Sequence, residues 1–496
     1  MAILLAAITM AAVLAVSGTV LSRGPKRTIG VQREEVGAYA LQQLNQLASG
    51  YWARVAGEDD GAPPRVNGHD EFAAAWLREM RGNLHGLPLQ VIAQPFSTPG
   101  FQHYAPPSRP GQNEIIMVPG AVDPDRALLI VTHYDGEPFS KGSAYDDTSG
   151  AAIMLAVAKL LGSTWRSRGL PSITVEFVLF DAEEQGLVGS GAYLFDLRQK
   201  ALMPKPTVLV DEEQSGVGYP ARPFGLRSKP PMPAYATTTR LSKRLANVFG
   251  PVTKPSSAGL KRMMALLKSA RDQAYRQLRS TFPRLKYRGG KAAAFSPADE
   301  KYLLIGPNSV CCSDNAPFEA LGLPTAMFSG DASYYDKHHS SWAYPFDQPQ
   351  DTPTTLACDT GGKPSPTPAL QAALALPVDL TTSLVAAYAP PSKGAGLSVF
   401  AAPAVKGRST AFAGAALQKP RWSFGDGGTA SGALVHHAYR RSGSFDLTVI
   451  AGDVTRRYRV HVGSSLPRYH APFGRIPPPP IRPFHPRQLK GIRGCP

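Results

Sequence analysis

Hydrophobic and polar positions along the chain change their spacing several times, and each change indicates a different kind of element. Residues 31–87 carry apolar side chains such as Val36, Ala40 and Leu44 near a 3.6-residue period, which predicts helix. Residues 89–118 hold short apolar runs broken by proline and glycine, which predicts small strands and loops. The amino-terminal part is therefore expected to be helical first and extended afterwards.

The central part of the chain alternates between continuous apolar runs and helical stretches. The runs lie at 127–135, 173–181, 207–211 and 324–330 and predict buried parallel strands. Residues 149–161 predict the helix that follows the first run. This alternation predicts an α/β fold, with a mostly parallel sheet flanked by helices.

A basic segment interrupts this pattern at 215–308, with helix-like spacing over 260–284. We expect it to be a solvated helical surface, the alternative being a lid or binding element over the site. Residues 364–377 are Pro-rich, and 381–388 suggest one more helix.

The carboxyl-terminal part has a different character. Short alternating runs over 397–463 predict a small all-β, immunoglobulin-like sandwich. The tail 464–496 is Pro-rich and basic, and we expect it to be extended and disordered.

Composition narrows the location and the partners. The chain has 53 Lys and Arg against 37 Asp and Glu, a formal charge of +16. That excess suits anionic partners such as cell-wall polymers or anionic lipid, or simply solvates the surface. No nucleic-acid-binding signature is present, so we expect no nucleic-acid partner. Residues 1–21 are almost wholly apolar or small, which predicts a signal peptide or membrane anchor and a body that is secreted or faces outside the cytoplasm.

The four cysteines do not form a C-x-x-C motif, so a zinc knuckle is not expected. In an oxidising compartment, Cys311 or Cys312 could form a disulfide with Cys358.

Acidic and histidine side chains follow successive predicted strands. They are His133 and Asp135 after the first run, Asp146 and Asp147 in the next loop, Glu183 and Glu184 after the second run, and Asp211 at the end of the third. Ligands bind at the carboxyl ends of strands in open α/β sheets, and carboxylates gathered there repel unless a cation holds them. Imidazole and carboxylate donors without a thiol suit Zn²⁺, Mn²⁺ or Co²⁺ in an open catalytic site.

Two such ions, ~3.5–4 Å apart, can share a bridging carboxylate and a water whose pKa they lower. A carboxylate that is not a ligand can then accept the water's proton. The adjacent residues Glu183 and Glu184 offer one side chain for each task. Asp135 is placed to orient the His133 imidazole.

Four sequence blocks resemble those of the M28 metallopeptidases. They are HYDGEPFSKGSAYDDTSG (133–150), FVLFDAEEQGLVGSGAY (177–193), VLVDEEQSG (208–216) and SDNAPFEALGLPTAMFSG (313–330). The resemblance implies a zinc-exopeptidase-like fold with two divalent metal ions, for which zinc is the preferred metal. It implies His133 and Asp211 as ligands of the first ion, Asp146 as a bridge, Glu184 on the second ion, and Glu183 as the general base.

The chain departs from that family at the last ligand. FDQPQDT (346–352) resembles the family's YHxPxDT motif and puts Asp347 in the histidine position. Asp347 is the ligand we prefer there, with His338 or His339 as the alternative. Asn315 also stands where the family usually has histidine.

The sandwich has a resemblance of its own. WSFGDGG (422–428), HHAY (436–439) and GSFDLTVIAGD (443–453) are similar to a PKD domain. Such modules act as spacers or bind extracellular polymers, and Trp422 and Phe424 are expected to lie in its core.

Taken together, the resemblances imply an exported metallopeptidase domain over 31–390, an aminopeptidase-type exopeptidase acting on peptide or protein substrates. Two alternatives stay open. A glutaminyl cyclase shares this fold with one metal, although the retained pair Asp146–Asp147 favours the dinuclear peptidase. A non-catalytic binding protein on the same fold is favoured only by Asp347.

Overall fold

The computed structural model describes residues 29–51, 53–57, 68–102, 107–215, 257–281, 313–328, 348–361 and 368–478. The expected signal or anchor at 1–21, most of the basic insert, and the candidate ligands Asp347, His338 and His339 lie outside these residues.

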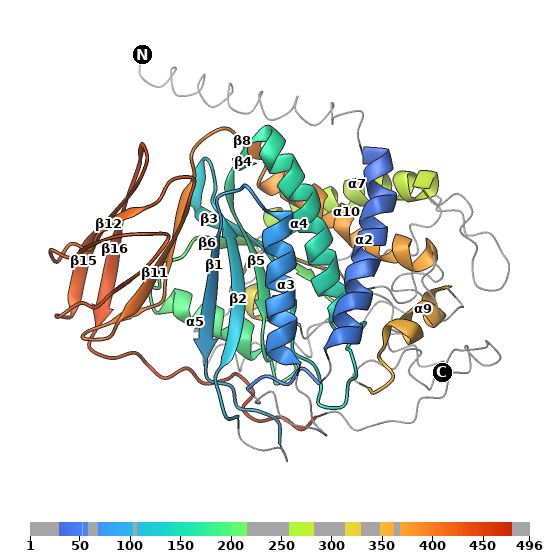
Figure 1. Cartoon of the computed structure of the whole chain (residues 1–496), viewed down its shortest axis with the longest axis horizontal. Coiled ribbons are helices and arrows are strands. Elements are labelled where there is room, and N and C mark those ends of the chain that lie inside the picture. Colours follow the sequence, from blue (N-terminus) through green and yellow to red (C-terminus); the bar gives the residue numbers. More distant parts are fainter. Residues whose placement is uncertain are drawn as a thin grey trace.

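A six-stranded sheet organises the main part of the molecule (Figure 1), in the order β1-β2-β5-β3-β6-β7. Its strands are β1 (Gln90–Phe96), β2 (Gly111–Val118), β3 (Asp123–His133), β5 (Ile173–Phe180), β6 (Lys205–Glu212) and β7 (Thr325–Phe328). The four strands β5, β3, β6 and β7 are parallel, and they coincide with the four apolar runs. The strands β1 and β2 add an antiparallel edge, so the α/β prediction is confirmed with a mixed sheet.

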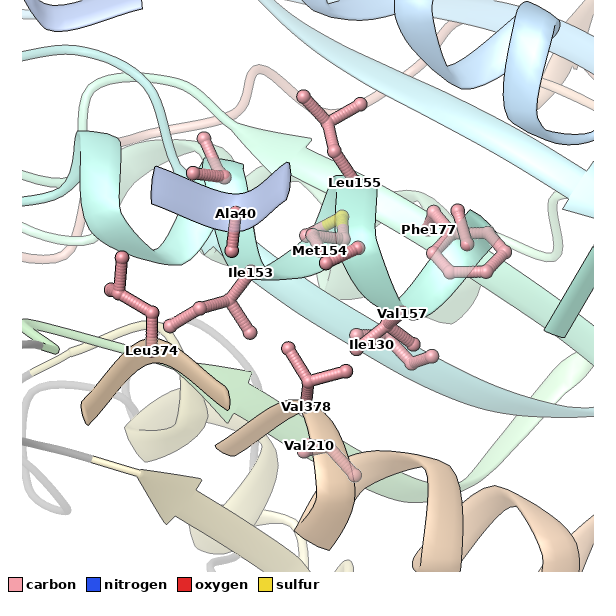
Figure 2. Close-up of a cluster of buried hydrophobic side chains, with 14 of the residues drawn as sticks. Ala40, Ile130, Ile153, Met154, Leu155, Val157, Phe177, Val210, Leu374 and Val378 are labelled. Carbon is pink, nitrogen blue, oxygen red and sulfur yellow. The ribbon is translucent and has the colours of Figure 1, made fainter. Parts of the chain in front are cut away.

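Helices cover one face of this sheet. They are α2 (Ile29–Gly50), α3 (His69–Asn83), α4 (Thr148–Arg168) and α10 (Pro368–Tyr388). Ile130 and Val210 of the sheet point toward Ile153 of α4 and Val378 of α10 in a shared apolar core (Figure 2). The expected helical stretch 31–87 is thus two helices, α2 and α3.

The other face is covered differently, because side chains at alternate positions of β3 point the opposite way. Leu129 and Val131 pack in a second core with α5 (Val188–Arg198) and α8 (Asn315–Ala320). Phe400 and Ala413 of the carboxyl-terminal sandwich join that core, so the sandwich lies against the sheet (Figure 1).

The helix α10 begins earlier than the sequence pattern predicts. It runs from Pro368 and includes Pro377, so much of the Pro-rich stretch 364–377 is helical. Among the described residues, Leu370–Tyr388 is long and apolar enough to cross a membrane by length and composition. With 72% of its apolar window buried, it packs as a core helix of this fold.

Two further helices are α7 (Ser257–Thr281) and α9 (Pro353–Gly361). The helix α7 lies in the basic insert, which we expected to be a solvated helical surface, and one of its faces is buried. Met263, Ala270 and Ala274 are buried in the core with α10 and α2. Basic residues of α7 such as Lys261 are exposed, so α7 is amphipathic.

The sandwich consists of two sheets, β10-β16-β15-β12-β13 and β14-β11-β9. Its strands are β9 (Leu397–Ala401), β10 (Ala404–Val405), β11 (Thr410–Ala416), β12 (Arg421–Ser423), β13 (Thr429–Ser431), β14 (Leu434–His437), β15 (Gly443–Ala451) and β16 (Val454–Gly463). Trp422 and Phe424 are both buried in its core, as predicted. A short pair, β4 (Leu170–Pro171) with β8 (Pro391–Ser392), lies at the junction with the main sheet.

The segment after the sandwich is ordered where it was expected to be disordered. Residues 464–478 return to the main sheet's side of the molecule, where Tyr469 and Ala471 pack on buried side chains. The apolar and aromatic side chains among the prolines provide these contacts, which a composition argument overlooks. Cys358 of α9 forms a disulfide, and its partner lies outside the described residues.

Candidate metal centre

The carboxyl ends of β3, β5 and β6 bring the predicted side chains to one edge of the sheet. His133, the last residue of β3, is fully buried. It stands level with Phe180, after which β5 ends and the loop with Glu183 and Glu184 begins. Parallel pairing thus gathers residues that are far apart in sequence.

His133, Asp146 and Glu184 form one group in which the ligand atoms all lie within 4.8 Å of one another. Nε2 of His133 lies 3.1 Å from Oδ1 of Asp146. An imidazole nitrogen and two carboxylates converging at this range suit a divalent metal ion.

Asp135 holds the histidine and the glutamate loop together. Its Oδ1 lies 3.3 Å from Nδ1 of His133, within ion-pair range but outside hydrogen-bonding geometry. The same carboxylate accepts the backbone N–H of Glu183 at 3.0 Å and of Glu184 at 3.1 Å. Asp135 therefore fixes the two halves of the site relative to each other.

A second group overlaps the first and consists of His133, Asp147 and Glu213. Both carboxylate oxygens of Asp147 are already hydrogen-bonded within the protein. They accept from Gly150 N, Gln214 N and Thr132 Oγ1. It caps the amino terminus of α4. Asp146 is therefore the better placed of the two aspartates to bind a metal.

Glu213 is a residue that the sequence argument missed. Val131 pairs with Asp211, so His133 stands level with position 213 two residues further along. Oε2 of Glu213 lies 3.8 Å from Nε2 of His133 and accepts a hydrogen bond from Ser313 Oγ at 2.8 Å. The end of the apolar run pointed to Asp211, while the strand register would have pointed to Glu213.

Asp211 is buried on the same side of β6 but belongs to neither metal-ligand group. Its Oδ2 accepts the backbone N–H of Asn315 at 2.9 Å, at the start of α8. Burial raises the pKa of Asp211 to about 7. Asn315, in the position of the family's histidine, donates its side-chain amide to Glu319.

Glu137 is a second residue that the sequence argument missed. It is 3% exposed, and its Oε2 has no hydrogen-bond partner. Burial, together with the nearby Asp135 and Asp146, raises the pKa of Glu137 to about 9, and its carboxyl group contacts that of Glu184. Glu137 is buried and Glu184 half-buried, and two carboxyl groups in contact in such a setting share a proton or hold a cation.

The cluster as a whole carries an excess of negative groups. Its carboxyl groups are Asp135, Glu137, Asp146, Asp147, Glu183, Glu184, Asp211, Glu213 and Asp314. Burial is the main cause that raises the pKa of Glu183 and Glu213 well above the ordinary value, with repulsion from neighbouring carboxylates adding to it. The buried Arg54 offsets part of this charge, and its own pKa is lowered by burial to about 10.

This arrangement fits a divalent metal. Oδ1 of Asp211 and Oε2 of Glu137 are buried oxygens without a hydrogen-bond partner, and a protein normally satisfies such atoms. A bound cation would relieve both the unmet oxygens and the repulsion. The last-ligand candidates Asp347, His338 and His339 lie outside the described residues, so their place at this site stays a prediction.

Comparison with known families gives one match within the main α/β part of the chain and one within the sandwich. Residues 113–262 match the model of Peptidase family M28, and residues 402–457 match that of the PKD domain. Both resemblances predicted from the sequence are confirmed.

Curated relatives include a probable zinc metalloprotease of Leptosphaeria maculans, 24% identical over 45% of this chain and 52% of the relative. Aminopeptidase YwaD of Bacillus subtilis is 39% identical over 15% of each chain. The chain thus spans about half the length of the first relative and much less of the second.

Among solved structures, a glutaminyl cyclase of an Acidobacteriales bacterium covers 74% of this chain and 97% of its own, with 15% identity and a TM-score of 0.44. A Zn-dependent exopeptidase of Parabacteroides distasonis covers 70% and 97%, with 13% identity and a TM-score of 0.42.

Proposed function

We propose that this chain, which carries an M28 peptidase segment followed by a PKD domain, is an exported metal-dependent exopeptidase of the aminopeptidase type. The observation that carries the proposal is the group of buried His133, buried Asp146 and half-buried Glu184 at the carboxyl edge of the sheet. The relatives named zinc metalloprotease and aminopeptidase agree with it.

Two divalent metal ions, with zinc as the preferred metal, would be held by His133, Asp146, Glu184 and one further residue. That residue belongs to β6 or to the loop that follows it. We assign that last position to Glu213 in preference to Asp211, because Glu213 lies 3.8 Å from the His133 imidazole and belongs to a metal-ligand group, whereas Asp211 belongs to neither group. Asp347 remains the proposed further ligand.

Bound metal supplies Lewis-acid activation of water and of the scissile carbonyl. Glu183 is then the general base, accepting the proton of the attacking water and donating it to the leaving amine. Burial and the neighbouring Asp314 and Asp135 raise the pKa of Glu183, which favours proton transfer. Asp135 orients this residue through its backbone N–H.

Peptides or proteins are the proposed substrates, and residues 1–21 would direct the chain out of the cytoplasm. The PKD domain could in addition contact an extracellular polymer. Its strand β16 carries exposed basic side chains, Arg457, Arg459 and His461, which suit an anionic polymer.

The test is the metal content of the purified full chain together with hydrolysis of aminoacyl-anilides, with and without a chelator. We expect about two metal ions per chain and hydrolysis that chelation abolishes and zinc restores. One ion, with cyclisation of amino-terminal glutaminyl peptides, would establish the cyclase alternative. A chain that binds no metal and hydrolyses nothing would support the alternative of a non-catalytic binding protein.

A further inference from the structure

The loop that carries Glu183 and Glu184 is held in an unusual backbone conformation. Three of its residues adopt positive φ angles, Ala182 at 58°, Gly186 at 102° and Leu187 at 59°. Residues with a Cβ disfavour this region by about 1–2 kcal/mol each, and they persist there only where the surroundings impose it. The loop closes on itself through backbone hydrogen bonds from Gly186 N and Leu187 N to Glu183 O and from Val188 N to Ala182 O. Contacts from outside the loop add further support.

Part of that support comes from within the peptidase region. Asp135 receives the backbone N–H groups of Glu183 and Glu184. On the next residue, Gln185 donates from Nε2 to Ala56 O at 2.9 Å and accepts from Gly100 N at 3.0 Å. These bonds hold the first half of the loop.

The second half is supported by the segment after the sandwich, residues 464–478, here called the strap. Tyr469 donates its hydroxyl to Val188 O at 2.8 Å, and its ring lies 5.3 Å from that of Phe195. Phe473 lies against Gly186, where a Cβ would come within 3.1 Å of it. The strap thus contacts the loop at Gly186 and Val188, on either side of Leu187, which has a positive φ.

The strap is fixed at both of its ends. Beyond Phe473, Gln102 donates its backbone N–H to Ile476 O at 2.8 Å, and Phe101 pairs with Ile476. Before Tyr469, the chain leaves β16 of the sandwich. A segment held at both ends loses little entropy on making its central contacts, so those contacts are effective supports.

The sandwich in turn is fastened to the peptidase sheet. Leu202 and Ala401 exchange two backbone hydrogen bonds of 2.9 and 2.6 Å. Thr174 and Ser398 share a hydroxyl hydrogen bond of 2.6 Å, and Tyr458 donates to Asp125 at 3.1 Å. The sandwich is therefore a platform from which the strap starts at a defined place.

We propose that Tyr469 and Phe473 are positioning residues for the catalytic loop, and that the sandwich serves this chain by holding the strap in place. The inference rests on the proposed function, because it assigns the strap a role in orienting Glu183 and Glu184. It adds an intramolecular task to a module otherwise regarded as a spacer or a polymer binder.

The test compares full-length variants Phe473→Ala, Phe473→Leu and Tyr469→Phe with His470→Ala, whose side chain is exposed on the same strap. We expect Phe473→Ala to lower kcat about 10- to 100-fold, since a displacement of ~1 Å at a catalytic group can cost about 100-fold. KM should change little, and Phe473→Leu should restore most of the rate.

Hydrogen exchange supplies a readout that does not depend on turnover. The amides of Gly186, Leu187 and Val188 should exchange faster in Phe473→Ala, while those of β3 keep their protection. Unchanged exchange, or faster exchange with an unchanged kcat, would overturn the inference. If the wild type binds metal but hydrolyses nothing, the proposed function fails, and the exchange of these amides still decides whether the strap holds the loop.

Discussion

His133 and His69 are both buried and both flanked by two aspartates, yet their surroundings differ in how charge is balanced. His69 bonds Asp70 through Nδ1 at 2.8 Å and Asp181 through Nε2 at 2.7 Å. Arg109 pairs with Asp70, and Gln112 N donates to Asp181 at 2.7 Å. At His69, each ring nitrogen and each of the two carboxylates has a partner in the protein.

Around His133 the negative charge is not balanced by partners among the described residues. Its neighbours include carboxyl oxygens with no partner, on Asp211 and Glu137, and an excess of buried acidic groups. Buried histidine and aspartate therefore have two different roles in this protein. The His69 network fastens α3 to the end of β5, whereas the His133 cluster is complete only with an added cation. A histidine–aspartate contact is not a metal site by itself; the unmet charge around it is the informative feature.

The largest expected effect comes from Glu183→Gln. It removes the proposed general base but no proposed ligand, so hydrolysis should fall about 100- to 10,000-fold while metal content stays at the wild-type value. Steady-state kinetics and elemental analysis of the same preparation measure both. The exposed Glu71 provides the matched control, Glu71→Gln. Loss of metal in Glu183→Gln would make Glu183 a ligand instead.

The next effect separates Glu213 from Asp211. Glu213→Gln should weaken metal binding by at least about 10- to 100-fold, the range that even outer-shell partners reach. Asp211→Asn should cost less, because Asp211 is bonded to the start of α8. Competition with a coloured chelator gives both affinities. The reverse order would return the ligand role to Asp211.

The last prediction concerns the balanced network around His69. Although burial opposes the charged form, the bonds to Asp181 and Asp70 raise the pKa of His69 to about 9. A folded-state pKa above the unfolded value of 6.5 means that His69 stabilises the fold fully below pH 6.5 and loses this contribution as the pH rises through about 9.

At about 1.4 kcal/mol per pKa unit, that contribution is on the order of 3 kcal/mol. Urea unfolding across this pH range should show the decline in the wild type and a flatter profile in His69→Gln. Equal slopes in the two proteins would show that His69 is not charged in the folded state.

Much of the fold followed from the sequence because its signals are local. The four apolar runs became the four parallel strands, and Trp422 and Phe424 lie in the sandwich core as expected. His133, Asp146 and Glu184 could be brought together because strand ends of a parallel sheet meet at one edge.

What the sequence could not supply depends on register and on long-range packing. The choice between Asp211 and Glu213 turns on which position of β6, or of the chain just after it, stands level with His133, and an apolar run does not encode that. Glu137 lies in a loop with no periodic signal. The strap looked disordered because its prolines dominate the composition, while Tyr469 and Phe473 find their contacts only in the folded chain.

The docking of Phe400 and Ala413 on the main sheet has a consequence for how such a chain can be inherited. A recombination event that cut near residues 390–397 would separate the two sequence modules. Each product would then expose the apolar surface that the other module covers. Leu202 and Ala401 would each lose their backbone partner. The two modules match different sequence families. We nevertheless expect them to be inherited together, to unfold together on heating and to resist proteolysis as one unit.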